Sequence, residues 1–147
     1  MKKLLLFISL VLCATSAFYE KKGKRSKNAI PETHLCSEPH SIFFRGMKPE
    51  PGEVYKGHQA GFTAECEAMV DVHTDLIITT VTANGKEVFN DSQSARNIIP
   101  KGVMFNLNHY YDVPSDAEAG HWEMITKFTD MDGNIIFCAQ VIWDFEE

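Results

Sequence analysis

The chain has 147 residues, of which 44% are apolar, 11% aromatic and 23% charged. These values are typical of a single folded domain and exclude a disordered tail, a collagen-like repeat or a coiled coil. The formal net charge is −6, but residues 28–147 carry seven basic against 19 acidic residues, and such an acidic body argues against binding to a nucleic acid.

The first 17 residues have the layout of a secretory signal peptide. Lys2 and Lys3 precede the apolar stretch 4–14, and the small residues Thr15 and Ala17 stand where a cleavage site requires them. The apolar stretch is much shorter than the roughly 20 residues that span a bilayer, which disfavours a membrane anchor. We therefore expect a protein that is secreted or delivered to the lysosomal or endosomal lumen.

Residues 18–40 contain the basic run 21–25 and little apolar material. This composition predicts a basic flexible N-terminal arm, followed by a folded domain over residues 41–147.

From residue 41 onward the apolar residues recur with a period of two, the signal of β-strands. Asn84-Gly85 is a strong hairpin signal, whereas the polar stretch 91–97 is typical of a loop. Seven or eight strands at a spacing of about ten residues predict an all-β fold, an immunoglobulin-like antiparallel β-sandwich, with a barrel as the alternative. The predicted strands are residues 41–45, 53–58, 61–72, 76–83, 86–90, 103–113, 121–129 and 135–144.

Three cysteines remain once the signal peptide is removed, so at most one internal disulfide forms. Cys66 lies on the apolar phase of its strand, where a thiol behaves as a small hydrophobic group. This placement favours a disulfide between Cys36 and Cys138.

The sequence contains none of the common catalytic or nucleotide-binding motifs, and no cysteine or histidine spacing suggests a metal site. We therefore expect no enzymatic activity, no cofactor and no metal, although the abundant carboxylates leave a glycosidase pair open. Asn90-Asp91-Ser92 is an N-glycosylation acceptor in a predicted surface loop.

The sequence lacks catalytic motifs but is rich in large apolar side chains, particularly in the last hairpin. They fill a sandwich core in the simplest interpretation. In the alternative interpretation the two sheets diverge and leave an apolar cavity for a ligand.

The order of motifs resembles the ML family of lipid-recognition domains, secreted β-sandwich proteins that include the Niemann–Pick type C lumenal sterol carrier and the phosphatidylglycerol/phosphatidylinositol transfer proteins. The similar features run from Cys36 to Trp143: the strand at 42–44, Pro49 and Pro51 before Lys56-Gly57, the alternating strand 62–70, Asn84-Gly85, the segment 103–108 before Val113-Pro114, Gly120-His121-Trp122, and the closing Asp130, Asp132-Gly133 and Phe137-Cys138. The family's second disulfide has no counterpart in residues 91–100.

The resemblance implies a protein that carries a phospholipid or a sterol between its two sheets and transfers it between membranes. It also implies the disulfide Cys36–Cys138, which agrees with the argument from Cys66. Its partners would be the lipid and, transiently, a membrane surface, and we expect a monomer. A non-carrier binding module of adhesion or lectin type, or a lipid-presenting activator of a lumenal hydrolase, are the alternatives. The predicted lipid-binding residues are Phe62, Phe89, Ile99, Val103, Phe105, Leu107, Trp122, Met124 and Phe137.

Overall fold

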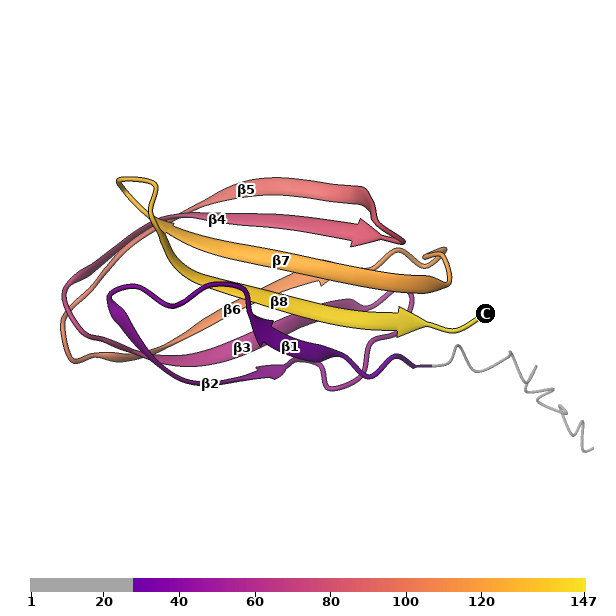
Figure 1. The fold of residues 1–147 in the computed structure, drawn as a ribbon, viewed down its shortest axis with the longest axis horizontal. Helices are drawn as coiled ribbons and strands as arrows, with labels where there is room; N and C mark the ends of the chain where they lie inside the picture. The colour runs from indigo at the N-terminus through magenta and orange to yellow at the C-terminus, as the bar shows by residue number, and fades with distance from the viewer. Residues whose placement is uncertain (1–27) are drawn as a thin grey trace, which may run out of the picture.

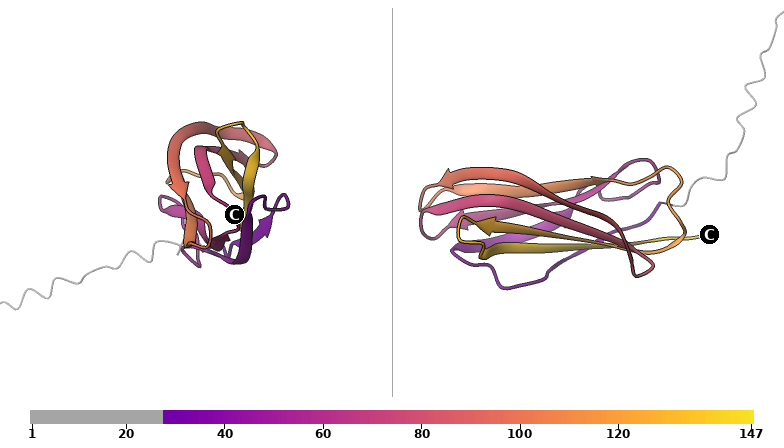
Figure 2. Two further views of the ribbon diagram at one scale, coloured as in Figure 1. Left: turned by 90° about the vertical axis from the view of Figure 1, so that its left-hand side faces the viewer. Right: turned by 90° about the horizontal axis from the view of Figure 1, so that it is seen from above.

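The computed structural model describes residues 28–147, so the predicted signal peptide and the basic run 21–25 lie outside the described residues. Within residues 28–147, eight antiparallel strands form two packed layers without a helix (Figure 1), and the end-on view in Figure 2 shows the layers facing each other. The predicted β-sandwich is confirmed, and the barrel alternative is wrong. The strands are β1 (Glu32–Leu35), β2 (Ile42–Pro49), β3 (Gln59–Ala68), β4 (Val72–Ala83), β5 (Lys86–Ile99), β6 (Met104–Asp112), β7 (Gly120–Asp130) and β8 (Ile135–Phe145).

The two sheets differ in size and meet along two seams. One sheet has the strand order β1-β8-β7-β4-β5 and the other the order β2-β3-β6. At the closed seam β1 contacts β2. At the open seam the edge strands β5 and β6 approach each other through side chains, without hydrogen-bonded pairing. No helix suited to crossing a bilayer occurs within residues 28–147.

Alternation along β3 and β6 determines which side chains enter the space between the sheets. Phe62 of β3 pairs with His109 of β6, and Cys66 pairs with Phe105, so the partners share a face. Gly61 allows the two strands to approach closely, because a β-carbon there would lie 2.3 Å from the carbonyl oxygen of His109. The sequence pattern of this segment therefore places β6 with its apolar side chains turned inward.

The hairpin predicted at Asn84-Gly85 is confirmed. Both residues have positive φ angles, 51° and 77°, the backbone conformation of a type I′ turn, which matches the right-handed twist of the flanking strands. The turn joins β4 to β5 and thereby places β5 at the edge of the larger sheet.

Aromatic side chains fill the centre of the sandwich. The ring of Phe62 lies 6.5 Å from that of Phe128 and 6.2 Å from that of Phe137, so these contacts join the two sheets. Trp122 stacks on Trp143 at 6.0 Å nearer the end that carries the C-terminus. These side chains are buried, and the middle of the sandwich is packed.

The N-terminal boundary of the folded domain lies earlier than residue 41. β1 pairs with β8 from Glu32 to Leu35, and Ala29 forms a bridge with Val54. The predicted arm over residues 18–40 is therefore wrong for its described part. β1 is short and mostly exposed, so it has no buried apolar face and its sequence lacks the alternation of apolar and polar residues that identifies a strand.

Two further boundaries need correction. The strand predicted over residues 53–58 is reduced to the bridge at Val54. The stretch 91–97, predicted as a loop, belongs to β5, whose side chains are exposed along nearly its whole length. Asn90 is exposed as expected, but it lies within β5 and not in a loop.

Candidate functional site

An apolar pocket of about 350 Å³ opens between the two sheets at the open seam. β5 supplies one wall and β6 the other, while Phe128 of β7 forms the inner end. The pocket therefore runs from the surface at the open seam toward the space between the sheets. Its lining residues are Thr74, Ala95, Asn97, Ile98, Ile99, Pro100, Val103, Phe105, Asn106, Leu107 and Phe128.

A β-bulge in β4 lies beside the pocket. The register shifts between Thr74 and Leu76 against β5, and between Thr74 and Ile77 against β7. Arg96 donates a 2.8 Å hydrogen bond from Nε to Asp75 Oδ1 at the bulge, and the Thr74 hydroxyl donates to the carbonyl oxygen of Ala95. Bulges bend a strand and increase its twist, and this one lies where Thr74, Ala95 and Asn97 join the lining of the pocket.

The structure places four of the predicted lipid-binding residues around the pocket: Ile99, Val103, Phe105 and Leu107. Phe105 and Leu107 point inward because they occupy alternate positions of β6. Ile99 and Val103 flank the β5–β6 turn, where the pocket opens.

The other five predicted residues do not line this pocket. Phe62, Met124 and Phe137 are fully buried in the packed centre. Trp122 is also buried, with its indole Nε1 donating a 3.0 Å hydrogen bond to the carbonyl oxygen of Glu118. Phe89 stands further along the open seam.

Sequence reasoning missed most of the wall contributed by β5, together with Thr74, Asn106 and Phe128. The stretch 91–97 was interpreted as a loop, so Ala95 and Asn97 carried no expectation. Phe128 is one of the large apolar residues of the last hairpin. Its position at the inner end of the pocket depends on the pairing of β7 with β4, which the sequence does not reveal.

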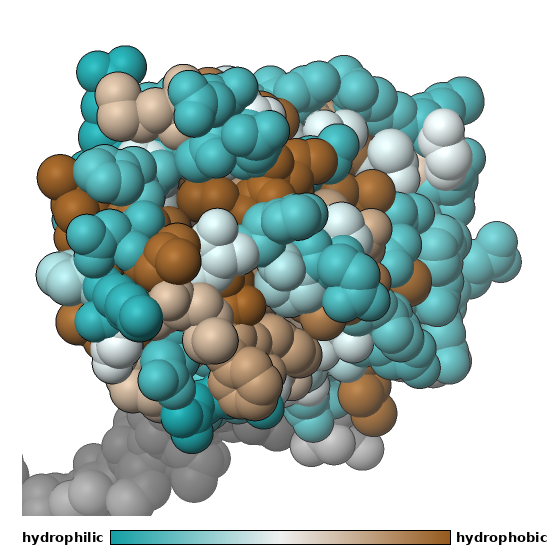
Figure 3. Space-filling model, turned by 60° about the vertical axis from the view of Figure 1, so that its left-hand side comes forward, coloured by the Kyte–Doolittle hydropathy of each residue, from teal (hydrophilic) through white to brown (hydrophobic). Residues whose placement is uncertain are grey.

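Apolar side chains are exposed around the mouth of the pocket. Ile98 is 61% exposed, and the β3–β4 and β5–β6 turns bring further apolar groups to the same end of the sandwich. The β5–β6 turn lies against the end of β3, because Gly102 N donates a 2.7 Å hydrogen bond to Ala68 O. Figure 3 turns this end of the sandwich toward the viewer and shows brown apolar side chains at the surface among teal hydrophilic ones. The exposed apolar residues here are Met69, Val70, Ile98, Val103 and Met104.

A larger depression of about 660 Å³ lies by the β1–β2 connection and the β7–β8 turn. Its lining includes Glu38, His40, Asp130 and Asn134. Because this polar surface lies outside the inter-sheet space, it is poorly suited to an apolar ligand. Among residues 28–147, no group of three or more histidine, cysteine or acidic side chains is arranged to hold a metal ion.

Two side-chain interactions join β5 and β6 in the middle of the open seam. The rings of Phe89 and Tyr111 lie 5.2 Å apart. Next to them, Asp91 of β5 interacts electrostatically with His109 of β6. Burial lowers the pKa of His109 from 6.5, and the negative charge of Asp91 partly opposes this shift.

This histidine predicts a loss of stability in acid. Below about pH 6.5 the unfolded chain binds a proton at His109 that the folded chain accepts only at lower pH. The neutral, buried His109 therefore contributes its full stabilisation of the folded state above about pH 6.5. This contribution is lost as the pH falls through the lowered pKa of His109 in the folded protein. We expect the free energy of unfolding, measured with urea, to be smaller at pH 5 than at pH 7.5. The difference between the two pH values should be smaller in His109→Gln than in the wild-type protein. Asp91→Asn should enlarge the loss, and an unchanged pH slope in both variants would contradict this assignment.

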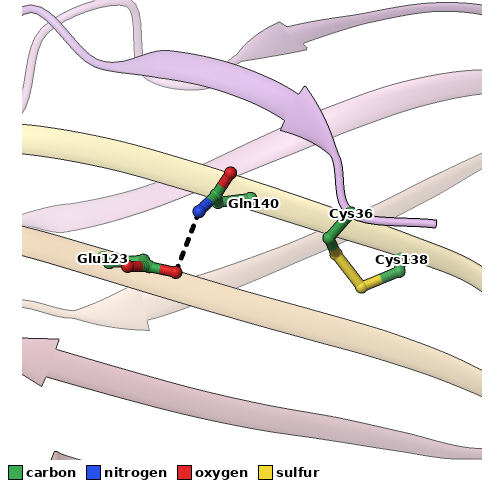
Figure 4. Close-up of a disulfide and its surroundings, with 4 residues drawn as sticks. All are labelled: Cys36, Glu123, Cys138 and Gln140. Carbon is green, nitrogen blue, oxygen red and sulfur yellow. Dashed lines mark hydrogen bonds between the residues drawn. A yellow bond between two sulfur atoms is a disulfide. The ribbon is translucent and has the colours of Figure 1, made fainter.

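The disulfide between Cys36 and Cys138 is confirmed and joins the chain after β1 to β8 (Figure 4). Beside it, Gln140 of β8 donates a 2.9 Å hydrogen bond from Nε2 to Glu123 Oε1 of β7. Cys66 is free and buried, and desolvation raises the pKa of its thiol to about 11. A thiol in this environment is unreactive, so Cys66 is a packing residue.

No protein-family model matches the sequence, and a comparison with curated proteins finds no match. Solved structures do match the fold. The Niemann-Pick type C2 protein from Japanese carpenter ant is similar with a TM-score of 0.55 and 12% identity, over 76% of this chain and 96% of that one. Chicken MD-1, solved in complex with lipid IVa, has a TM-score of 0.50 and 11% identity, over 79% of this chain and 99% of that one. The resemblance inferred from the sequence is thereby confirmed for the fold: the chain has the β-sandwich architecture of the ML-domain proteins.

Proposed function

We propose that this protein binds lipid, taking the apolar part of a phospholipid or sterol into the pocket at the open seam and transferring it between membranes. The observation that carries the proposal is the apolar pocket between the sheets, with Phe105 and Leu107 on one wall and Phe128 at its inner end. A carrier of this kind needs an apolar cavity and an accessible mouth rather than reactive groups.

The dimensions of the pocket support partial burial of a lipid. Its volume lies at the lower end of the roughly 300–1,000 Å³ of small-molecule sites. Each methylene that leaves water contributes about 0.8 kcal/mol, so about ten methylenes would supply about 8 kcal/mol before the entropic costs of binding. The remainder of the ligand would lie against the exposed apolar side chains around the mouth.

The fold comparison supports the same proposal, because MD-1 was solved with a lipid bound. We propose further that the protein acts as a monomer after secretion or delivery to the endosomal or lysosomal lumen. There Asn90, exposed on β5, would carry an N-linked glycan. The apolar mouth would make transient contact with a membrane surface during transfer.

Lipid uptake tests the proposal directly. Delipidated protein is expected to bind a fluorescent sterol or a fluorescent phosphatidylinositol analogue with a stoichiometry of about 1:1. Absence of uptake across sterols, phospholipids and fatty acids would contradict a carrier function.

A non-carrier binding module is the second candidate, and the packed centre of the sandwich favours it. Phe62, Met124 and Phe137 leave no exposed surface between the sheets in that region. Mass spectrometry of organic extracts from the native protein distinguishes the two functions, since only a carrier is expected to retain a stoichiometric lipid.

A further inference from the structure

A row of polar side chains crosses the inner face of the larger sheet, next to the pocket. Asp91 of β5, Thr79 of β4 and Thr126 of β7 are register partners on neighbouring strands, so their side chains share one face. Two residues further along β7, the ring of Phe128 contacts Phe62 of the other sheet, which identifies this face as the inner one. We call Asp91, Thr79 and Thr126 the polar row.

The two threonines of the polar row are buried without a hydrogen-bond partner. Thr79 is 2% exposed and Thr126 0%, and neither hydroxyl is paired with another polar group. Buried hydroxyl groups in proteins are nearly always satisfied by protein, water or ligand. The pair therefore has unused hydrogen-bonding capacity in the interior of the sandwich.

The polar row lies just beyond the inner end of the pocket. Thr126 is two residues from Phe128, a separation of about 6–7 Å along a strand. His109 lies on the inner face of the opposite sheet as the register partner of Phe62, and it interacts with Asp91 across the open seam. A ligand longer than the pocket would consequently bring its far end to the polar row once the Phe128 ring moved aside.

The spacing of the two hydroxyls suits a single uncharged oxygen. Directly opposed residues of antiparallel strands have β-carbons about 4.5–5.5 Å apart, so one ligand hydroxyl between them can donate to one threonine and accept from the other. A carboxylate is unsuited to this position, because Asp91 belongs to the same row and a buried charge is strongly disfavoured.

We propose that Thr79 and Thr126 form a subsite for a hydroxyl group carried at the inner end of the lipid, far from its head group. This inference rests on the proposed lipid-binding function and adds a ligand class to it: lipids hydroxylated near the end of their hydrophobic part. The pocket holds the apolar portion, and the polar row recognises the terminal hydroxyl.

Palmitate and ω-hydroxypalmitate form a matched pair of probes. Both are to be titrated into the delipidated full-length mature protein by displacement of a fluorescent polyene fatty acid. We expect ω-hydroxypalmitate to bind about tenfold more tightly, because it gains hydrogen bonds to groups that are otherwise unpaired. In the double variant Thr79→Val and Thr126→Val, which keeps the side-chain volumes, this preference should disappear while the affinity for palmitate stays within about twofold.

Thr129→Val is the matched control. Thr129 is also buried and its hydroxyl also lacks a partner, but it lies beyond Phe128 toward the β7–β8 turn. The tenfold preference should persist in this variant. Equal affinity of the wild-type protein for both probes, or a preference that survives the double substitution, overturns the inference and leaves the proposed function intact. Failure of both probes to bind, together with sterols and phospholipids, overturns both.

Discussion

Phe105→Asp is expected to abolish lipid uptake. Phe105 points into the pocket from β6, and a carboxylate at this position would remove apolar contact area and have to be desolvated when a hydrocarbon chain enters. The expected loss of affinity is at least about hundredfold. Titration with the fluorescent sterol and phosphatidylinositol analogues measures it, and thermal unfolding of the same sample establishes that the sandwich still forms.

Asn108→Asp is the matched control for this substitution. Asn108 lies three residues after Phe105 in β6, is exposed, and faces away from the pocket. The control introduces the same charge into the same strand and should leave affinity within a few-fold of the wild-type value. Undiminished uptake by Phe105→Asp would show that the lipid is held elsewhere, and equal losses in both variants would indicate a general effect of charge.

The strands that bury one face were predictable from the sequence. The alternation in β3 and β6 identifies the residues that face inward, and Asn84-Gly85 identifies the hairpin that directs the chain back along β5. In these segments the local signal and the packed structure depend on the same feature, the burial of every second side chain.

β1 and β5 were missed or shortened for the opposite reason. Both are edge strands of the larger sheet, and most of their side chains are exposed. An edge strand exposed on both faces has no apolar half, so its polar residues resemble those of a loop. Since β5 forms one wall of the pocket, the error about residues 91–97 also removed Ala95 and Asn97 from the expected site.

Apolar composition alone does not separate a packed core from a ligand pocket. Phe62 and Phe105 belong to similar alternating strands, yet Phe62 is enclosed by Phe128 and Phe137 while Phe105 lines an opening. The difference arises from the position of the partner strand. β6 lies at the edge of its sheet and β3 in the middle, so only the side chains of β6 reach the open seam.

The two seams have complementary roles in this arrangement. At the closed seam β1 contacts β2 and continues into it through residues 36–41, while the disulfide joins the end of β1 to β8 within the larger sheet. At the open seam, by contrast, β5 and β6 are held by side-chain contacts such as that between Phe89 and Tyr111. Opening for a ligand is therefore expected at the open seam, because only side-chain contacts between β5 and β6 have to break there.

Removal of the disulfide is expected to cause the largest loss of stability. The bond between Cys36 and Cys138 closes a loop with a sequence separation of 102 residues, and in the chain-entropy model a loop of this length contributes about 4–5 kcal/mol. The double variant Cys36→Ser and Cys138→Ala leaves no reactive thiol at either position and places no hydroxyl at the buried Cys138 site. Its melting temperature should fall by roughly 15–20 °C for a domain of this size.

A reducing agent supplies the control for this prediction. Reductant should lower the melting temperature of the wild-type protein toward that of the double variant, and it should leave the variant itself unchanged. Because Cys66 is buried with a raised thiol pKa, it is not expected to respond to reductant or to exchange with the disulfide. A wild-type melting temperature unaffected by complete reduction would show that the strand pairing of β1 with β8, rather than the covalent bond, holds β1 in place.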